Sequence, residues 1–150
     1  MALETVVLEP EHLAKLIENV PASMSEMLGR AYFSPGSAAY CLLQDGVPVF
    51  AGGIVNQQWQ RGEAWILPTP FFRGHVKTCF RIMKKMLPQI ASGNHFGRVQ
   101  AVAIDGVSVV LFEHLGFEYE GTLKRFGPSG ETCELYSKIF ENNGHTDESL

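Results

Sequence analysis

Residues 105–117, which read DGVSVVLFEHLGF, decide the fold. Asp105 is suited to accept hydrogen bonds from the free amides at the start of a helix. Gly116 is suited to the left-handed conformation that ends one, and Ser108 is small enough for close packing. We therefore predict a helix that Asp105 caps and that ends at Leu115 and Gly116.

Apolar runs on both sides of this helix have the composition of strands. We predict strands at Gly97–Ile104, Phe117–Phe126 and Thr132–Ile139, and the last two are joined through Gly127-Pro128-Ser129-Gly130. Residues Glu141–Leu150 are polar and are expected to fray.

A long amphipathic helix precedes these elements. From His75 to Ala91, apolar residues recur at helical spacing, namely Val76, Cys79, Phe80, Met83, Leu87 and Ile90. The remaining faces carry Lys77, Arg81, Lys84 and Lys85, which are most simply a solvated surface. Before the helix we predict a strand at Glu63–Thr69, which Pro68 and Pro70 end.

The first third of the chain predicts a strand, two short helices and a hairpin. The strand is Thr5–Leu8, the first helix starts at Pro10, and a capping box at Ser23–Glu26 starts a second helix that runs to Ala31. Strands Ala39–Gln44 and Val47–Asn56 flank Asp45-Gly46, a strong hairpin signal. Gly52-Gly53 indicates either a bulge or a close approach of two backbones.

The order is β-α-α-β-β-β-α-β-α-β-β, which predicts a single α/β domain over residues 1–140 with a mixed central sheet flanked by helices. A length of 150 residues, 45% of them hydrophobic, suits one sizeable core.

The net charge of -4 argues against nucleic acid as a partner, and no apolar window is long enough to span a membrane. Three cysteines without metal-ligand spacing favour a reducing, cytoplasmic compartment and no metal site.

The 105–117 stretch resembles the C-terminal signature of the Gcn5-related N-acetyltransferase (GNAT) superfamily. The matching positions are Glu113, Leu115, Gly116 and Phe117, with Asp105 where the family has Asn and Ser108 where it has Ala. The match continues through Glu118–Gly121, and the element order extends the resemblance over about residues 4–140. It implies a GNAT-like fold with acetyl-CoA as the cofactor.

The resemblance also implies a pyrophosphate loop after strand Glu63–Thr69. The residues at that place are Arg73, Gly74, His75, Val76, Lys77 and Thr78, and Asp105 joins them as a cofactor-binding candidate. Arg73-Gly74 resembles the start of the family motif, but Val76 and Thr78 occupy its two small-residue positions. Their β-branched side chains weaken acetyl-CoA binding, whereas Lys77 and Arg81 offer phosphate charge by another geometry.

Acid and base candidates are weak. The family tyrosine that protonates the departing thiolate is replaced by Phe112, which has no proton to give. Glu63 and His75 are the candidate catalytic bases, and each is also interpretable as an ordinary surface residue. Among the cysteines, only Cys133 is a candidate reactive thiol. Phe71 and Phe72 are either an exposed contact or core residues.

A narrower resemblance links the chain to acetyltransferase-like proteins of short-tailed bacteriophages, including an internal virion protein. It rests on residues 63–70, the basic helix that follows and residues 130–137. It implies a GNAT-fold protein with a degenerate acetyl-CoA site, weakly or non-catalytic, that binds a virion or host protein inside the virion or host cytoplasm. The alternative is an active acetyl-CoA-dependent N-acetyltransferase acting on a small amine or protein lysine. Val76 and Thr78 weigh toward the first.

Overall fold

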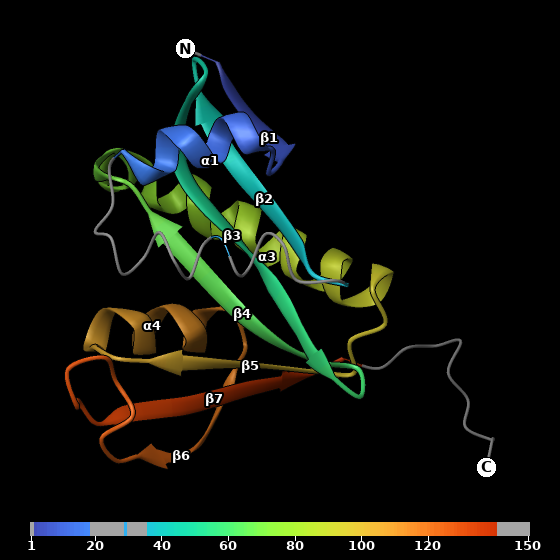
Figure 1. The fold of residues 1–150 in the computed structure, drawn as a ribbon, viewed down its shortest axis with the longest axis vertical. Coiled ribbons are helices and arrows are strands. Elements are labelled where there is room, and N and C mark those ends of the chain that lie inside the picture. The colour runs from blue at the N-terminus through green and yellow to red at the C-terminus, as the bar shows by residue number, and fades with distance from the viewer. Residues whose placement is uncertain (1, 19–28, 30–35, 141–150) are drawn as a thin grey trace.

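A computed structural model describes residues 2–18, 29 and 36–140. A seven-stranded sheet with the order β1-β2-β3-β4-β5-β7-β6 forms its centre (Figure 1). The elements are β1 Leu3–Val7, α1 Pro10–Ile17, β2 Ala38–Gln44, β3 Val47–Gln58, β4 Arg61–Pro68, the 3₁₀ helix η1 Pro70–His75, α3 Val76–Gly93, β5 Arg98–Ala103, α4 Gly106–His114, β6 Glu118–Leu123 and β7 Cys133–Ile139. All neighbouring strands are antiparallel except β4 and β5.

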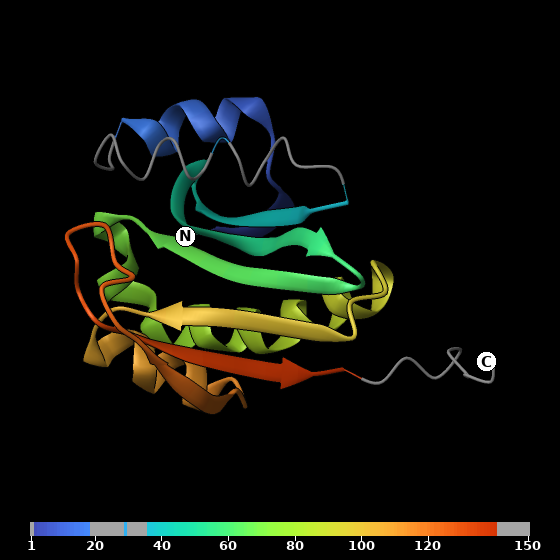
Figure 2. The same cartoon turned by 60° about the horizontal axis from the view of Figure 1, so that its bottom comes forward.

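Helices cover both faces of the sheet, which confirms the predicted fold class. Figure 2 shows α1 on one face and α3 and α4 together on the other. Two buried clusters follow from this layering: Leu13 and Leu16 of α1 pack with Leu67 of β4, whereas α3 and α4 pack over the opposite side chains of the sheet. Adjacent β4 residues therefore serve different cores, because successive strand side chains alternate between faces.

The short-range signals of the sequence act as predicted. The Asp105 carboxylate accepts from the Ser108 amide at 2.8 Å and caps α4, and Gly116 ends this helix with φ of 88°. Asp45 and Gly46 both have positive φ, 50° and 83°, as a tight two-residue hairpin turn requires.

Several boundaries differ from the prediction. Residues 70–75 form a 3₁₀ helix instead of a loop, and the Thr69 side chain caps it by accepting from the Phe71 amide. Strand β6 ends at Leu123, three residues earlier than predicted, and Arg125 beyond it has a left-handed φ of 56°. The predicted second helix at Ser23–Ala31 and the polar C-terminal residues lie outside the described residues, Gly29 excepted.

The Gly52-Gly53 pair is a close approach and not a bulge. Both glycines stay in register with β2 and β4, and the irregularities lie elsewhere, at Leu42/Leu43 and Asn56/Gln58. A Cβ at Gly53 would collide with the Ala38 carbonyl oxygen. Glycine at this position therefore lets the β2 backbone approach β3 closely.

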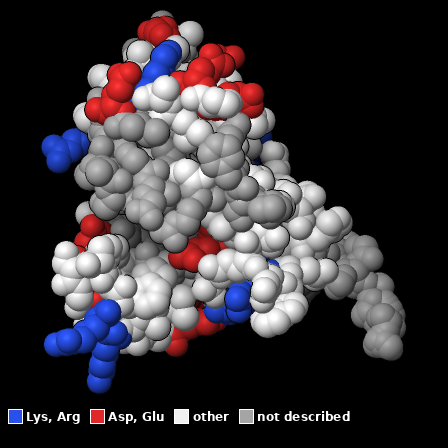
Figure 3. Space-filling view, viewed as in Figure 1, with Lys and Arg blue, Asp and Glu red and all other residues white. Residues whose placement is uncertain are grey.

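Charge is unevenly distributed over the fold. Figure 3 shows acidic side chains gathered at the end of the molecule that carries α1, where Glu9 caps the helix and Glu11 lies in its first turn. The basic residues of α3 belong to a helix on the opposite face of the sheet. No helix among the described residues is long and apolar enough to cross a membrane.

We predict that Gly53→Ala destabilises the protein. The added methyl group would lie 2.8 Å from the Ala39 Cα as well as against the Ala38 carbonyl, and backbone atoms cannot yield like a flexible side chain. Urea unfolding should show a loss of about 1–3 kcal/mol, the usual cost of overpacking. Gly121→Ala on β6 is the control, since a Cβ there meets nothing within 4 Å. Equal stability of the two variants would contradict the close approach.

Candidate functional site

Strands β4 and β5 pair only briefly and then part. Their parallel ladder joins Arg61 to Arg98, Gly62 to Val99 and Glu63 to Gln100, and it stops there. Both strands continue, β4 to Pro68 beside β3 and β5 to Ala103 beside β7, so a gap opens between them (Figure 1). We call this gap between residues 64–68 and 101–103 the wedge. Its facing edges have no strand partner among the described residues, so an extended ligand with amide groups can complete the open ladder.

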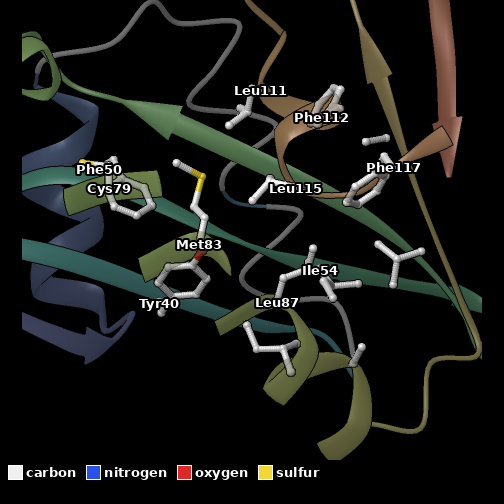
Figure 4. Close-up of a cluster of buried hydrophobic side chains, with 14 of the residues drawn as sticks. Tyr40, Phe50, Ile54, Cys79, Met83, Leu87, Leu111, Phe112, Leu115 and Phe117 are labelled. Carbon is white, nitrogen blue, oxygen red and sulfur yellow. The ribbon is translucent and has the colours of Figure 1, made fainter. Parts of the chain in front are cut away.

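Below the wedge, α3 and α4 face each other through apolar side chains. Met83 and Leu87 come from α3, and Leu111 and Phe112 come from α4 (Figure 4). These four side chains, together with Ala64 of β4, line a small cavity of about 30 Å³. The site therefore has an apolar floor.

The start of α3 lies just beyond the end of β4. Its N-cap residue, His75, makes no side-chain capping bond, and the first turn contains no acidic residue. Free amides at a helix start attract anions, and the exposed side chains of Arg73 and Lys77 add positive charge here. Gly74 has open space where a Cβ would be, so the segment leaves room at its surface. These features fit a phosphate group.

The His75 ring is engaged elsewhere. Its Nε2 lies 2.6 Å from the Oε1 of Gln44, at the end of β2. Glu63 lies near the opposite end of β4, beside Gln100. Glu63 is near the start of β4 and His75 lies beyond its end, so the two candidate bases are separated by the length of the strand and do not form one catalytic pair.

Glu63 is half-buried where the β4–β5 ladder ends. Its side chain is on the α1 face, because Trp65 two residues on packs in the α1 cluster. The Gln57 amide donates to the Glu63 Oε1 at 2.7 Å. Burial raises the pKa of this carboxyl, and the Gln57 hydrogen bond opposes that shift. A raised pKa improves a carboxylate as a proton acceptor near neutral pH.

Asp105 and Phe112 occupy opposite ends of α4. Hydrogen bonds from Ser108 lower the pKa of Asp105, so its carboxylate is committed to the helix cap. Phe112 is buried between Phe117 and Tyr136, with ring centroids 5.7 and 6.1 Å away. Position 112 therefore adds only apolar surface to the cavity.

The sequence matches no protein-family model and no curated protein. Solved structures do match. An acetyltransferase of the GNAT family from Streptococcus pneumoniae is 15% identical over 93% of this chain and 100% of its own, with a TM-score of 0.72. A variant of the spermidine N-acetyltransferase SpeG from Vibrio cholerae is 13% identical over 91% of this chain and 93% of its own, also with a TM-score of 0.72. This chain has the GNAT fold.

Within the GNAT fold, the predicted cofactor residues divide into two groups. Residues 73–78 lie together where η1 meets α3, whereas Asp105 lies at the start of α4, after the end of β5. Val76 is 37% exposed and Thr78 is half-buried. The β-branched residues are therefore partly presented to solvent at the helix start, where the resemblance requires small ones.

Sequence reasoning missed two side chains near the wedge. Gln57 holds Glu63, and Tyr40 lines the cavity together with Phe112. The alternation of side chains along a strand predicts which face of the sheet a residue lies on. It does not predict which strand lies beside it, so the sequence could not identify these two contacts.

One prediction about reactivity is wrong. Cys133 is buried, and burial raises the pKa of its thiol, so it is a poor nucleophile.

Phe71 and Phe72 divide between the two alternatives, because Phe71 is 51% exposed whereas Phe72 packs edge-on against the core residue Phe50. In residues 2–18, 29 and 36–140, no group of three His, Cys, Asp or Glu side chains is placed to hold a metal ion.

We predict that Glu63→Gln stabilises the protein at pH 7. A carboxyl with a raised native pKa binds its proton more tightly when folded, so it lowers stability as the pH rises through that pKa. Glutamine avoids this loss and keeps an oxygen for Gln57. The gain should be up to about 1 kcal/mol at pH 7 and should vanish below about pH 4, in urea unfolding at several pH values. The control is Glu118→Gln, on an exposed residue of β6, which should show no such gain. If the stability difference between Glu63→Gln and the wild type did not change with pH, the raised pKa of Glu63 would be wrong.

Proposed function

We propose that this protein binds acetyl-CoA in the wedge and transfers the acetyl group, at a low rate, to an amine. The observation that carries this proposal is the parting of β4 and β5 after Glu63 and Gln100. It leaves an open backbone edge on each strand, with a helix start free of acidic residues beyond one of them. An extended amide chain that ends in a pyrophosphate has the complementary chemistry.

The residues at the α3 start fit the phosphates of such a ligand. Backbone amides of Val76, Lys77 and Thr78 belong to the first turn, and Arg73 and Lys77 supply positive charge. The side chains of Val76 and Thr78 narrow the approach to these amides. We therefore expect acetyl-CoA to bind more weakly than it would if both positions were glycine. Acetyl-CoA supplies an activated acyl thioester when bound.

Two features of the chain set the expected rate. We assign to Glu63, which is half-buried with a raised pKa where the β4–β5 ladder ends, the role of accepting a proton from the amine. Phe112 provides no proton for the leaving group. Holding the amine and thioester together still accelerates transfer, since proximity alone lowers the barrier. We propose an amine as the acceptor, either a small molecule or a protein lysine.

A second candidate function rests on the outer surface of α4. Val107 is 79% exposed and Val110 is 51% exposed, with Ile104 beside the helix start at 48%. Exposed apolar clusters of this kind favour contact with another protein. This patch supports the alternative that the fold binds a virion or host protein, as the bacteriophage resemblance implies. Binding of that partner should not need acetyl-CoA and should be lost in Val107→Ser/Val110→Ser.

Calorimetric titration with acetyl-CoA tests the first function. We expect micromolar to submillimolar binding and a higher melting temperature with ligand, because a ligand of the native state stabilises it. Lys77→Ala should weaken binding several-fold by removing one charge-assisted contact. Lys84→Ala, two turns further along α3 and equally exposed, is the matched control and should bind as the wild type does.

Absence of binding at millimolar acetyl-CoA would overturn the proposed function and leave the α4 patch as the basis for a role. If Lys77→Ala and Lys84→Ala weakened acetyl-CoA binding equally, the phosphate site at the start of α3 would be wrong. The conclusion that the protein binds acetyl-CoA would still stand.

A further inference from the structure

We propose that the outer edge of β1 is an interaction surface, on which a second copy of this chain adds its own β1 as an antiparallel strand. The two seven-stranded sheets would join into one continuous sheet around a two-fold axis. This inference does not depend on acetyl-CoA binding.

The backbone of β1 carries the inference. β1 is at one end of the strand order and pairs with β2 alone in the described part of the chain (Figure 1). The Leu8 amide donates to the Ala39 carbonyl oxygen at 3.1 Å, so the backbone groups of Leu8 face β2. Successive residues of an antiparallel strand turn their backbone groups to opposite sides. The N–H and C=O groups of Leu3, Thr5 and Val7 therefore face the open edge.

These outward groups are complementary to those of a second copy. An antiparallel register centred on Thr5 places Thr5 opposite Thr5, and Leu3 opposite Val7, of the two copies. Each of these is a hydrogen-bonded pair, so all outward N–H and C=O groups of the strand would find partners. A register centred on Glu4 would place two carboxylates opposite each other and Val7 beyond the end of the other strand. The pairing centred on Thr5 is therefore favoured.

The side chains of the outward residues suit the same pairing. Val7 is in register with Tyr40, which packs in the cluster under α3, so Leu3, Thr5 and Val7 lie on the α3 face. Leu3 is 41% exposed and Val7 is 70% exposed. In the proposed register each Val7 would lie beside Leu3 of the second copy, and this apolar contact would be made twice across the two-fold axis.

A groove beside the edge leaves room for this contact. It has a volume of about 770 Å³ and lies between the first two strands and α3, where Val7, Met86 and Ile90 contribute apolar lining. The apolar side chain that the second copy places opposite Val7 would stand at the open side of this groove. The charged lining residues are Glu9 and Lys85, one of each sign, so the groove has no net charge that would oppose a second copy.

The other edge of the sheet is protected against such pairing. β6 carries Glu118 and Glu120, and its register with β7 is irregular between Tyr119 and Gly121. Charged side chains and irregularities of this kind keep an edge strand from pairing with another chain. β1, by contrast, keeps a regular register with β2, and its one charged residue, Glu4, is on the α1 face. The β1 edge is therefore the one suited to a second copy.

The first test is sedimentation velocity of the full chain over a range of concentrations. We expect a monomer–dimer equilibrium, and Thr5→Pro should abolish the dimer. Proline removes the outward N–H of Thr5 but leaves the β1–β2 ladder intact, because this N–H points away from β2. The control Thr5→Ala keeps the N–H and should still dimerise. A wild-type chain that is monomeric at every concentration would overturn the inference.

A second variant decides the question if a melting scan shows that Thr5→Pro does not fold. Val7→Lys places a charge on the open edge and should raise the concentration needed for dimerisation about 10-fold or more. Its matched control is Ile139→Lys, on an exposed apolar residue of β7, which is not an edge strand and should dimerise as the wild type does. A dimer that persists in Val7→Lys, or that is lost instead in Val107→Ser/Val110→Ser, would overturn the assignment to β1.

The third test addresses the register. Thr5→Cys should form a disulfide-linked dimer under mild oxidation, because the residue faces its own copy at a Cα separation of about 5.5 Å, within the range of disulfides. Leu3→Cys faces Val7 and should cross-link far less. The native cysteines are all buried and should not compete. Equal cross-linking of the two variants would overturn the proposed pairing.

Discussion

The parting of β4 from β5 is the constraint on which the rest of this structure depends. A parallel ladder of only three residue pairs holds the two strands, and beyond it each strand keeps its antiparallel neighbour. Separated strands leave a gap in the sheet that must be closed by other atoms. The side chains of α3 and α4 pack together over one face of the sheet at this place. A complete β4–β5 ladder would leave neither strand with an unpaired edge at this place.

The residues that we propose to act at this gap come from elements that are distant in sequence. The base candidate Glu63 belongs to β4, and the positive charge of Arg73 and Lys77 comes from η1 and the start of α3. Position 112, where the family places its acid, is occupied by an apolar ring. The Phe112 ring therefore contributes packing to the core between α3 and α4 and no ionisable group.

Local signals in the sequence were sufficient for most of the fold. The Asp105 cap, the Asp45-Gly46 turn and the apolar periodicity of α3 each depend on residues close in the chain, and the structure confirms all three. The candidate site was less predictable. Neither the 3₁₀ helix at residues 70–75 nor the cavity that Tyr40 and Phe112 both line follows from spacing, because each depends on strand register and on packing between distant segments. The same reason explains the error at Cys133, whose burial is set by tertiary contacts.

The hydrogen bond between Gln44 and His75 has a consequence for how the helix start is held. It ties the N-cap residue of α3 to the end of β2, directly before the hairpin turn at Asp45 and Gly46. The position of the free amides is therefore fixed by the hairpin as well as by the short connection from β4. A change in the hairpin would therefore be felt at the start of α3, although the two segments are about thirty residues apart in the chain. The β2–β3 turn is in this sense part of the scaffold that orients this helix.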